Sequence, residues 1–385
     1  MTKNLHLQTI LAHLAEHGGI KDPYAASHIP IYQTATFDLA EQHGDKHYGY
    51  TRSENPTREA LENVFAIAER GIATVCTHTG IGAVALVFET ILKTGSHVLA
   101  EEDIYGGTYR LLDVYKQKFN ITVHYKDLTN HALVEETLNN NPISLVICES
   151  PTNPGLKIID LKIIATLAHK YNTILAVDNS VATFASQQPL SLGADISFSS
   201  TTKYIAGNGS VIAGAVTSKD PELAKKIAFT ANAFGRSQNP FDVFCVSLGV
   251  PTLPLRMKAH EQSAFIIAKY LEKHPNAALV RFPGLPSHPG HQIAKLQMSI
   301  MPAIITFDTQ TEEQALNFIK KAKLFKKKYS FGTPDSRANH PATMSHASTP
   351  NNVLKNIGIN THTIRLSIGL EHPDDLLSDL EQALS

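Results

Sequence analysis

Lys203 stands out in the stretch DISFSSTTKYIAGNGS (195–210), where it directly follows a run of four hydroxyl side chains. Such a lysine either belongs to a polar turn or is the centre of a site in which its amine acts as a nucleophile or a base. Ser200 and Thr202 occupy alternate positions, so their hydroxyls face one side if the strand continues. Capping of the strand end is the alternative role for both hydroxyls.

Two further stretches carry residues that such a site would use. Asp178 ends the apolar run ILAVD, where a carboxylate is costly unless it is paired. Asp178 has three alternative roles: a cap for a turn, an ion-pair partner of Lys203, or a counter-charge for a protonated ring nitrogen or another cation. The turn TGIGA precedes a helix, and there Thr79 and Gly80 either cap that helix or leave its N-terminal N–H groups free for an anion.

A phosphate site, a carboxylate and a lysine together suggest the cofactor pyridoxal 5′-phosphate. This cofactor forms a Schiff base with a lysine amine, requires a carboxylate that keeps its ring nitrogen protonated, and requires donors for its phosphate. An aromatic ring that covers the cofactor is also expected, and Tyr105 in EEDIYGGTY can supply that face. On composition alone, a tyrosine at this position is more often a core residue.

Apolar runs alternate with helical segments between residues 56 and 218. Strands are predicted at 97–102, 121–125, 144–150, 174–180, 195–200 and 211–218, and helices from about 56 and at 81–92, 107–119 and 160–171. Repeated strand–helix–strand units with continuous apolar strands predict an α/β fold with a mostly parallel sheet between helices. Ligands bind at the carboxyl ends of such strands, so the turns that carry Gly80, Glu149, Asp178 and Lys203 should converge.

The pattern divides the chain into three parts. Residues 1–55 show little periodicity and many Gly, Pro, His and Tyr residues, and they are predicted to form an extended arm that contacts another molecule. Residues 56–245 form the predicted α/β domain. Residues 246–385 are predicted to form a smaller α+β domain, with a long helix at 254–275 and a strand at 361–370.

The composition is that of an ordinary globular protein. The 385 residues are 43% hydrophobic, and 34 Lys and Arg residues against 35 Asp and Glu residues give a net charge of −1. This balance gives no indication of a nucleic-acid partner or an anionic membrane surface. The three cysteines are far apart, which excludes a CxxC pair and fits a reducing compartment. Without a signal-peptide pattern or a long apolar run, the expected location is the cytoplasm.

Several stretches match a known family. They are YGYTRSENPTREALE, DIYGGTYRL, ESPTNPGLKIIDL, VDNSVATFASQQPLSLGADISFSSTTKY, FPGLPSHPGH, HPATMSH and IRLSIGLE. Over nearly its full length the chain resembles the Cys/Met-metabolism family of pyridoxal-phosphate enzymes, which includes cystathionine γ-synthase, cystathionine γ- and β-lyases, methionine γ-lyase and O-acylhomoserine sulfhydrylases. The resemblance implies the fold-type I architecture of the aspartate aminotransferase-like enzymes, and no metal.

The resemblance also implies roles for individual residues. Lys203, as the Schiff-base lysine and base, and Tyr105, as the ring-stacking group, are the expected catalytic residues. The residues expected to hold the cofactor are Lys203, Asp178, Tyr105, Gly80, Ile81, Ser200, Thr202 and Asn153. Tyr50 and Arg52, in YTR, are expected to reach the phosphate of a neighbouring subunit. A dimer is then the minimal active unit, and the family usually forms homotetramers, as pairs of such dimers.

Arg365 has an argument of its own. In HTIRLSIGLE the aliphatic side chains alternate on one face of a strand, so Arg365 points to the other face. There it is either a surface arginine or a planar fork that binds a carboxylate in a cleft. The resemblance implies that Arg365 binds the substrate's α-carboxylate, with Ser330 close by. Asn153, Tyr50 and Asp335 complete the expected substrate site.

Several positions depart from the common family pattern. The segment after the lysine often reads Gly-His-x-Asp in the family, whereas Asn208 and Ser210 remove both ionisable groups here. Gly107 stands where methionine γ-lyases usually have cysteine. Asp335 stands where cystathionine γ-enzymes usually have glutamate. Phe331 replaces the leucine of γ-enzymes and leaves β-lyase activity open, because bacterial β-lyases tend to have tryptophan there.

The leading functional prediction is a transsulfuration enzyme that performs γ-elimination or γ-replacement on cystathionine or an O-acylhomoserine. This prediction covers both cystathionine γ-synthase and cystathionine γ-lyase. Cystathionine β-lyase, methionine γ-lyase and O-acylhomoserine sulfhydrylase are the alternatives. A Rossmann-type oxidoreductase is disfavoured because TGIGAVA lacks the third glycine of the G-x-G-x-x-G turn. A non-catalytic relative is disfavoured because Lys203, Asp178 and Arg365 are all present.

Overall fold

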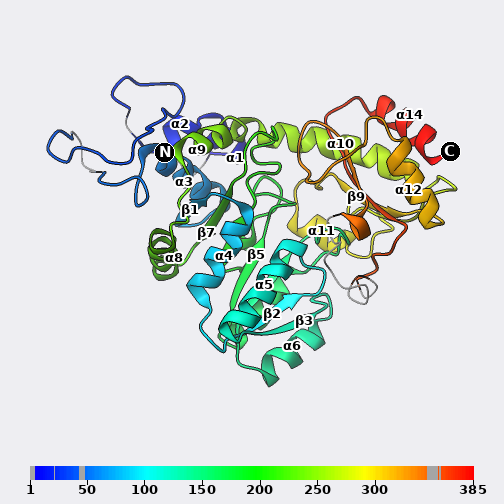
Figure 1. Cartoon of the computed structure of the whole chain (residues 1–385), viewed down its shortest axis with the longest axis horizontal. Coiled ribbons are helices and arrows are strands. Elements are labelled where there is room, and N and C mark those ends of the chain that lie inside the picture. Colours follow the sequence, from blue (N-terminus) through cyan, green and yellow to red (C-terminus); the bar gives the residue numbers. More distant parts are fainter. Residues whose placement is uncertain (1–4, 21, 43–47, 345–353, 355–356) are drawn as a thin grey trace.

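The computed structural model describes residues 5–20, 22–42, 48–344, 354 and 357–385. Its two sheets lie towards opposite ends of the chain's long axis (Figure 1). Among the residues that the structure describes, none of the helices is both long and apolar enough to cross a membrane.

The larger sheet has seven strands in the order β1-β7-β6-β5-β4-β2-β3. Their bounds are β1 Ala73–Thr77, β2 His97–Glu101, β3 Thr122–Lys126, β4 Ile143–Glu149, β5 Ile174–Asp178, β6 Ile196–Ser199 and β7 Gly214–Ser218. Five neighbouring strands, from β6 to β3, are parallel, and β7 is antiparallel to both β6 and β1. The predicted α/β fold with a mostly parallel sheet is confirmed.

Helices bury both faces of this sheet. Alternate residues of β4 point to opposite faces: Leu145 and Ile147 belong to one apolar cluster, whereas Val146 and Cys148 belong to another. The first cluster includes residues of α4 (Gly80–Ile91), α5 (Gly106–Phe119) and α8 (Pro221–Phe234); the second includes residues of α6 (His131–Asn140) and α7 (Leu161–Lys170). Burial on both faces explains why the strands read as continuous apolar runs.

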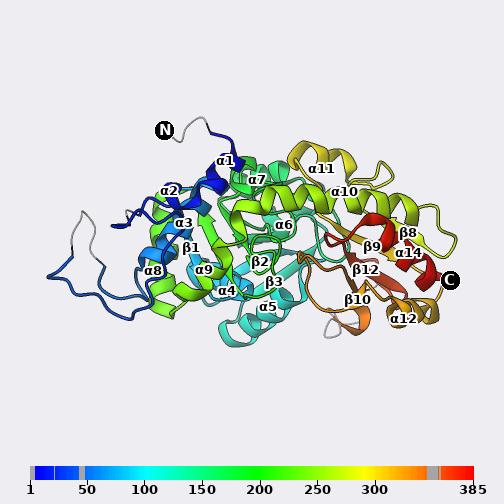
Figure 2. The ribbon, with the colours of Figure 1, turned by 90° about the horizontal axis from the view of Figure 1, so that it is seen from above.

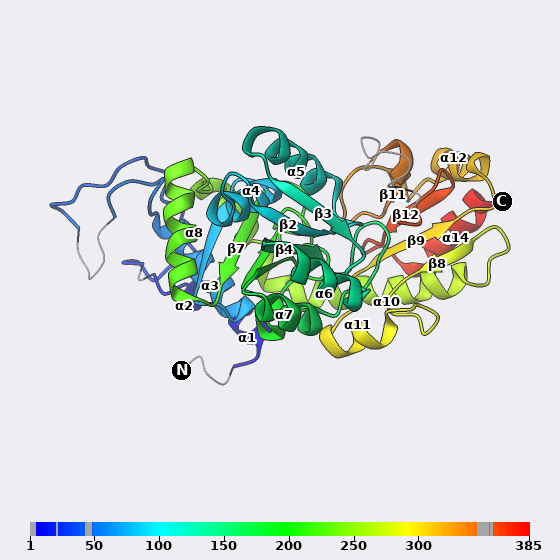
Figure 3. The ribbon, with the colours of Figure 1, turned by 90° about the horizontal axis from the view of Figure 1, so that it is seen from below.

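The smaller sheet has the order β10-β11-β12-β9-β8. Its strands are β8 Ala278–Arg281, β9 Ile304–Asp308, β10 Lys326–Lys327, β11 Arg337–Asn339 and β12 Thr363–Ser367. The helices of this region are α11 His291–Gln297, α12 Glu312–Lys321 and α14 Pro373–Leu384. Side chains from all three helices join an apolar cluster with β9 and β12. Figure 3 shows this sheet beyond α11, at the end that holds the C-terminus.

One long helix, α10 (Leu253–Leu271), joins the two parts of the fold. Its first residues, Leu253 and Met257, are buried in the cluster beside the large sheet. Ile267 and Leu271, near its end, are buried in the cluster of the small sheet. Figure 2 shows the helix extending from one part to the other. Because one rigid helix contributes to both cores, it fixes the two sheets relative to one another.

The N-terminal segment differs from the extended arm that its composition predicts. Residues 7–17 form two short helices, α1 (Leu7–Ala12) and α2 (Leu14–His17). Leu11 and Leu14 are buried in a cluster with residues of α3 (Pro56–Glu69) and α9 (Pro240–Ser247). Leu7, Ile10, Leu11 and Leu14 have the spacing of a helix face, so the signal was present but brief. The later part of this segment projects beyond α3 and α8 (Figure 1).

Candidate active site

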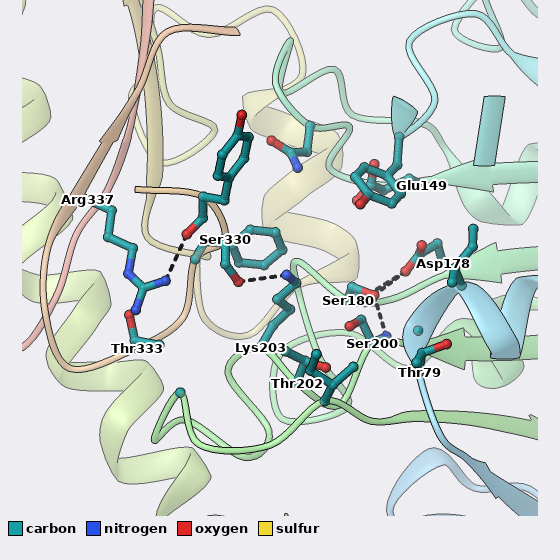
Figure 4. A pocket seen from close by; sticks show the side chains of 18 of the residues that line it. Thr79, Glu149, Asp178, Ser180, Ser200, Thr202, Lys203, Ser330, Thr333 and Arg337 are labelled. Atoms are coloured by element: carbon teal, nitrogen blue, oxygen red, sulfur yellow. Dashed lines mark hydrogen bonds between the residues drawn. The ribbon is translucent and has the colours of Figure 1, made fainter. Parts of the chain in front are cut away.

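A cavity of about 910 Å³ lies where the carboxyl ends of β4, β5 and β6 meet the smaller sheet. Its volume is within the range of small-molecule sites. Its lining residues come from strand ends, loops and helix starts of the large domain, and from strands β11 and β12 and the loops around them: Thr79, Gly80, Ile81, Val84, Tyr105, Arg110, Glu149, Asn153, Asp178, Ser180, Ser200, Thr202, Lys203, Gly209, Ser210, Val211, Ile212, Tyr329, Ser330, Phe331, Thr333, Arg337, Met344 and Arg365. The turns that the sequence predicts to converge therefore do converge, in one hollow (Figure 4).

Lys203 extends from the turns that follow β6 into the middle of this cavity (Figure 4). Its Nζ donates a hydrogen bond to Ser330 Oγ at 2.7 Å and lies 5.2 Å from the centre of the Phe331 ring. Burial, reinforced by the positive charge of Arg365, lowers the pKa of the Lys203 amine to about 8. With this pKa, roughly a tenth of the amine is neutral at pH 7, and the neutral form is the one that a nucleophile or general base requires.

Asp178, at the end of β5, is held by its own turn. Its Oδ1 accepts hydrogen bonds from the backbone N–H of Ser180 at 2.9 Å and from the Ser180 hydroxyl at 2.5 Å. Burial raises the pKa of Asp178 to about 6, although these two hydrogen bonds oppose the shift. Lys203 donates to Ser330 instead of Asp178, so the structural ion pair that the sequence left open does not form. The carboxylate remains available at the cavity for a cationic ligand.

The N-terminus of α4 faces the same hollow. Thr79 Oγ1 accepts from the Gly82 N–H at 2.8 Å, which confirms the capping role. The anion role is compatible with this cap, because one cap leaves other N–H groups of the first turn without an intrahelical partner. An added Cβ at Gly80 would lie 2.5 Å from Ser200 Cβ, so glycine allows the helix to approach the turn after β6.

Ser200 and Thr202 both line the cavity, but strand alternation, which was expected to place them on one side, is not the cause. The strand ends at Ser199, so the alternation of a strand does not extend to Thr202. The Ser200 N–H donates to Ser180 Oγ at 2.6 Å, which places this residue beside the Asp178 turn. Thr202 Oγ1 accepts from the Ala213 N–H at 2.8 Å and donates to the Ala213 carbonyl at 3.1 Å. Thr202 thus also fixes the segment that leads into β7.

Tyr105 lies at the start of α5 and is 40% exposed, with a pKa that burial raises. An added Cβ at Gly107 would lie 2.4 Å from Tyr105 Cε1, so a side chain at this position would displace the ring. Glu149, at the end of β4, is buried in the cavity wall, and burial raises its pKa. Its Oε2 has no hydrogen-bond partner among the described residues.

Arg365 on β12 is 2% exposed. Its Nη1 donates to Asn153 Oδ1 at 3.1 Å and its Nη2 to the Ser330 carbonyl at 2.8 Å, while its Nε has no partner among the described residues. Burial lowers the pKa of the guanidinium to about 10. Ile364 and Leu366 are core residues, so the predicted alternation is confirmed and Arg365 faces the cavity.

Three predicted site residues lie outside this cavity. Tyr50 is 48% exposed and pairs with Thr36 in an isolated bridge, and the Arg52 Nε donates to Asn232 Oδ1 at 3.2 Å. Both residues precede α3, away from Lys203 within one chain. Asp335 is at the rim of the smaller sheet, where it is bound by two basic side chains and does not line the hollow.

The sequence did not single out several lining residues. Ser180 sits two residues after Asp178, and a serine at this offset is a common turn signal, so it could have been found. Arg337 and Thr333 come from a segment with no recognisable strand pattern, and only the pairing of β11 with β12 brings Arg337 to the cavity. Arg110 belongs to the quoted DIYGGTYRL stretch but had no assigned role.

These groups fit the predicted cofactor. The close approach at Gly80 leaves a helix N-terminus and the Ser200 side chain beside one another, which suits a phosphate. The Asp178 carboxylate suits a protonated ring nitrogen, because a cation beside it offsets the cost of its burial. The Lys203 amine lines the same cavity as these groups, which suits a Schiff base with the cofactor's aldehyde.

Comparison with known proteins agrees with this geometry. The family model described as Cys/Met metabolism PLP-dependent enzyme matches residues 9–385. A cystathionine beta-lyase of Lactococcus lactis subsp. cremoris (strain MG1363) is 40% identical over 375 residues, which cover 96% of this chain and 97% of that protein. An L-methionine gamma-lyase of Fusobacterium nucleatum subsp. polymorphum is 39% identical, with coverage of 100% and 99%. The structure of a cystathionine gamma synthase from Xanthomonas oryzae pv. oryzae in complex with cystathionine superposes with a TM-score of 0.95 at 35% identity, covering 99% of this chain and 98% of that one.

Proposed function

The chain belongs to the Cys/Met metabolism family of PLP-dependent enzymes, and from this premise we propose that it performs γ-elimination or γ-replacement on cystathionine or an O-acylhomoserine. Its cofactor is pyridoxal phosphate and its chemistry is the transsulfuration of sulfur amino acids. The single observation that carries the finer proposal is the buried Lys203 amine, which shares one cavity with Asp178 and with the carboxylate-binding fork of Arg365.

Within this proposal, each residue has a separate task at the cofactor. Lys203 would hold it covalently, Asp178 would pair with its ring nitrogen, and Tyr105 would cover its ring. The N–H groups of Gly80 and Ile81, together with the hydroxyls of Ser200 and Thr202, would bind its phosphate, and Asn153 would lie near its phenolic oxygen. When bound, pyridoxal phosphate supplies an electron sink for negative charge at the substrate's Cα.

The substrate is held and deprotonated by residues of this chain. Arg365 binds the α-carboxylate, since its two hydrogen-bond partners Asn153 and Ser330 fix the guanidinium and its Nε is still unpartnered within the described part of the chain. As a neutral amine, Lys203 would take the Cα proton. For γ-chemistry it would have to give up that proton before it accepts a second one, from Cβ, and a pKa of about 8 suits an amine that both accepts and releases protons.

Ser330 supports Lys203 in this role. Its hydroxyl accepts the hydrogen bond from the amine, and its carbonyl accepts one from Arg365. The base and the carboxylate-binding group are thus joined through one residue. This arrangement favours a defined distance between the substrate's α-carboxylate and the proton that is removed.

Cystathionine β-lyase is the second candidate, because Phe331 places an aromatic ring 5.2 Å from Lys203 Nζ and 5.8 Å from the Arg365 guanidinium. β-Elimination requires only the Cα step, so the same base serves both reactions. Gly107 supports the cystathionine enzymes over methionine γ-lyase: its lack of a side chain leaves room for the Tyr105 ring. The product decides between the two candidates, since γ-elimination of cystathionine yields 2-oxobutyrate and β-elimination yields pyruvate.

We further propose that the active unit contains two copies of the chain, assembled in pairs as a homotetramer. Tyr50 and Arg52 lie away from the cavity of their own chain, and the segment that carries them projects from the fold (Figure 1). In a dimer they would reach the phosphate of the neighbouring cavity. Light scattering would measure the assembly, and an active monomer would exclude this role.

The experiment that tests the proposed function is a substrate panel on the purified holoenzyme and on Lys203→Ala. The panel contains cystathionine, homocysteine, methionine, cysteine, and O-acylated homoserine with cysteine, with products identified. The holoenzyme should show a visible absorbance that borohydride bleaches, and the variant should lose both that property and turnover while its circular dichroism is unchanged. Normal turnover by Lys203→Ala would contradict the assignment of the base.

A further inference from the structure

A second guanidinium, that of Arg337, lines the cavity, and none of the roles above accounts for it. The side chain is 15% exposed. Arg337 is the first residue of β11, whose register with β12 pairs it with Ser367. The neighbouring pair, Ala338 and Leu366, is part of the apolar core of the smaller sheet. Because side chains alternate along a strand, Arg337 and Arg365 share the opposite face, towards the cavity.

The two arginines are placed at a defined spacing. They are diagonal neighbours across an antiparallel pair, and such residues lie about 7–8 Å apart. Consecutive carbonyls also hold them: Arg337 Nη1 donates to the Tyr329 carbonyl and Arg365 Nη2 to the Ser330 carbonyl, each at 2.8 Å. A molecule bound to Arg365 through one carboxylate therefore has a second rigid cation within the length of an amino-acid side chain.

Arg337 retains capacity for a ligand. Its Nη2 donates to Asp335 Oδ1 at 3.1 Å, but its Nε is buried and has no partner among the described residues. Asp335 also binds Lys328 at 2.7 Å, so one carboxylate faces two cations and a net positive charge remains. The hydrogen bonds from Lys328 and Arg337 outweigh the opposing effect of partial burial and keep the pKa of Asp335 well below its usual range. The Asp335 carboxylate is therefore ionised and bound to Lys328 and Arg337.

The loop after Lys203 carries no acidic side chain at positions 209 and 210, which lie near Arg337. An added Cβ at Gly209 would lie 3.8 Å from Arg337 Nη2, so this loop lies directly against the guanidinium. Ser210, which also lines the cavity, stands where the family commonly has aspartate. Figure 4 shows Arg337 and Thr333 on the side of Lys203 away from Asp178 and Thr79, so Arg337 is remote from the expected phosphate site.

The charges of the cavity are unevenly placed. Its described lining contains four basic side chains, Arg110, Lys203, Arg337 and Arg365, and two acidic ones, Glu149 and Asp178. A phosphate at Gly80 would offset positive charge at its own end of the cavity, whereas Arg337 lies on the side of Lys203 away from that end (Figure 4). We propose that Arg337 binds an anionic group at the far end of the substrate's side chain. The preferred substrates are then amino acids that carry a second carboxylate. This inference rests on the proposed function, because it takes Arg365 as the site of the α-carboxylate.

Binding of two unreactive amino acids of equal length tests the proposal directly. L-2-aminoadipate and L-norleucine differ in that the first ends in a carboxylate and the second in a methyl group. Isothermal titration calorimetry on the holoenzyme should show about tenfold or more tighter binding of L-2-aminoadipate, which corresponds to about 1.4 kcal/mol. Equal dissociation constants for the two ligands would overturn the inference.

Variants assign the preference to Arg337. In Arg337→Gln the ratio of the two dissociation constants should fall to within about twofold of unity, and in Arg337→Lys it should lie between those of Gln and wild type, because lysine keeps the charge but loses the planar fork. Lys326→Gln is the matched control: it removes an exposed cation of the same sheet that does not line the cavity, and it should retain the wild-type ratio. A ratio that survives both Arg337 substitutions, or one that is lost in Lys326→Gln, would refute the role of Arg337.

Turnover separates this inference from the proposed function. The pair O-succinyl-L-homoserine and O-butyryl-L-homoserine differs only in whether the side chain ends in a carboxylate or a methyl group, and so does the pair S-(2-carboxyethyl)-L-cysteine and S-propyl-L-cysteine. Release of 2-oxobutyrate or pyruvate with a wild-type kcat/KM ratio near one would reject the inference alone. A clear preference in the binding experiment without turnover of any of these compounds or of cystathionine would reject the proposed function alone.

Discussion

Replacing Asp178 with asparagine should stabilise the cofactor-free protein and at the same time weaken its affinity for pyridoxal phosphate. Burial raises the pKa of this carboxyl from its usual value of 3.8 to about 6. Between these values the folded chain binds more protons than the unfolded chain, so stability falls as the pH rises through this window. Above pH 6 the ionised Asp178 lowers the free energy of unfolding of the cofactor-free protein.

The magnitude follows from the shift. About 2 pKa units at about 1.36 kcal/mol each give a cost of about 3 kcal/mol. The asparagine Oδ1 can still accept the two hydrogen bonds from Ser180, and their greater strength with an ionised acceptor is already contained in the pKa of about 6. The net expectation is therefore about 2–3 kcal/mol in favour of Asp178→Asn at pH 7.5. Bound cofactor reverses the sign, because only the carboxylate balances a protonated ring nitrogen.

Urea unfolding of the cofactor-free proteins at several values between pH 4 and pH 8 would measure this effect. Taking the difference between the two proteins at each pH removes contributions from the other buried acids, which both share. The difference should grow from pH 4 to pH 6 and then level off, while titration with pyridoxal phosphate shows weaker binding to the variant. A variant that is less stable at pH 7.5, or a difference that does not change with pH, would refute the reasoning.

Three other substitutions test the packing around the site. Gly107→Ala places a Cβ 2.4 Å from Tyr105 Cε1, so kcat/KM should fall about tenfold or more at an unchanged melting temperature; full activity would mean that the ring position is unimportant. Gly80→Ala separates α4 from Ser200 and should weaken pyridoxal-phosphate binding about tenfold in a cofactor titration, whereas undiminished affinity would exclude this phosphate site. Leu11→Ala removes a fully buried side chain and should cost about 2–4 kcal/mol in urea unfolding, and a loss below about 1 kcal/mol would show that α1 contributes little to the core.

Much of the large domain could be predicted from local pattern. The strands of 143–149 and 174–178 were found to within two residues, because both of their faces are buried and they read as continuous apolar runs. β1 was missed, and its residues ATVCT alternate between exposed and buried at their start. β7 was expected from 211 but begins at Gly214, since the preceding residues are held by Thr202 in irregular backbone.

The residues that lie near Lys203 show the limit of local reasoning. Ser330 is 127 positions away in sequence and Arg365 is further still, yet one hydrogen-bonded chain joins the three. No short-range pattern specifies such contacts, because they depend on how two separately folded sheets meet across α10. The family resemblance predicts roles for Ser330 and Arg365, whereas neither the resemblance nor a local pattern indicates a role for Arg337.

The sequence by itself determined the parallel architecture, the family and the chemical groups of the site, because burial periodicity and motifs are properties of consecutive residues. Only the tertiary structure decided which cations and acids share the cavity. It left Asp178 free of Lys203, bound Asp335 to Lys328 and Arg337 at the rim, and turned Arg337 towards the hollow. The physical reason is that the register of β11 on β12 selects the face of each side chain, and that register is set by pairing across the sheet.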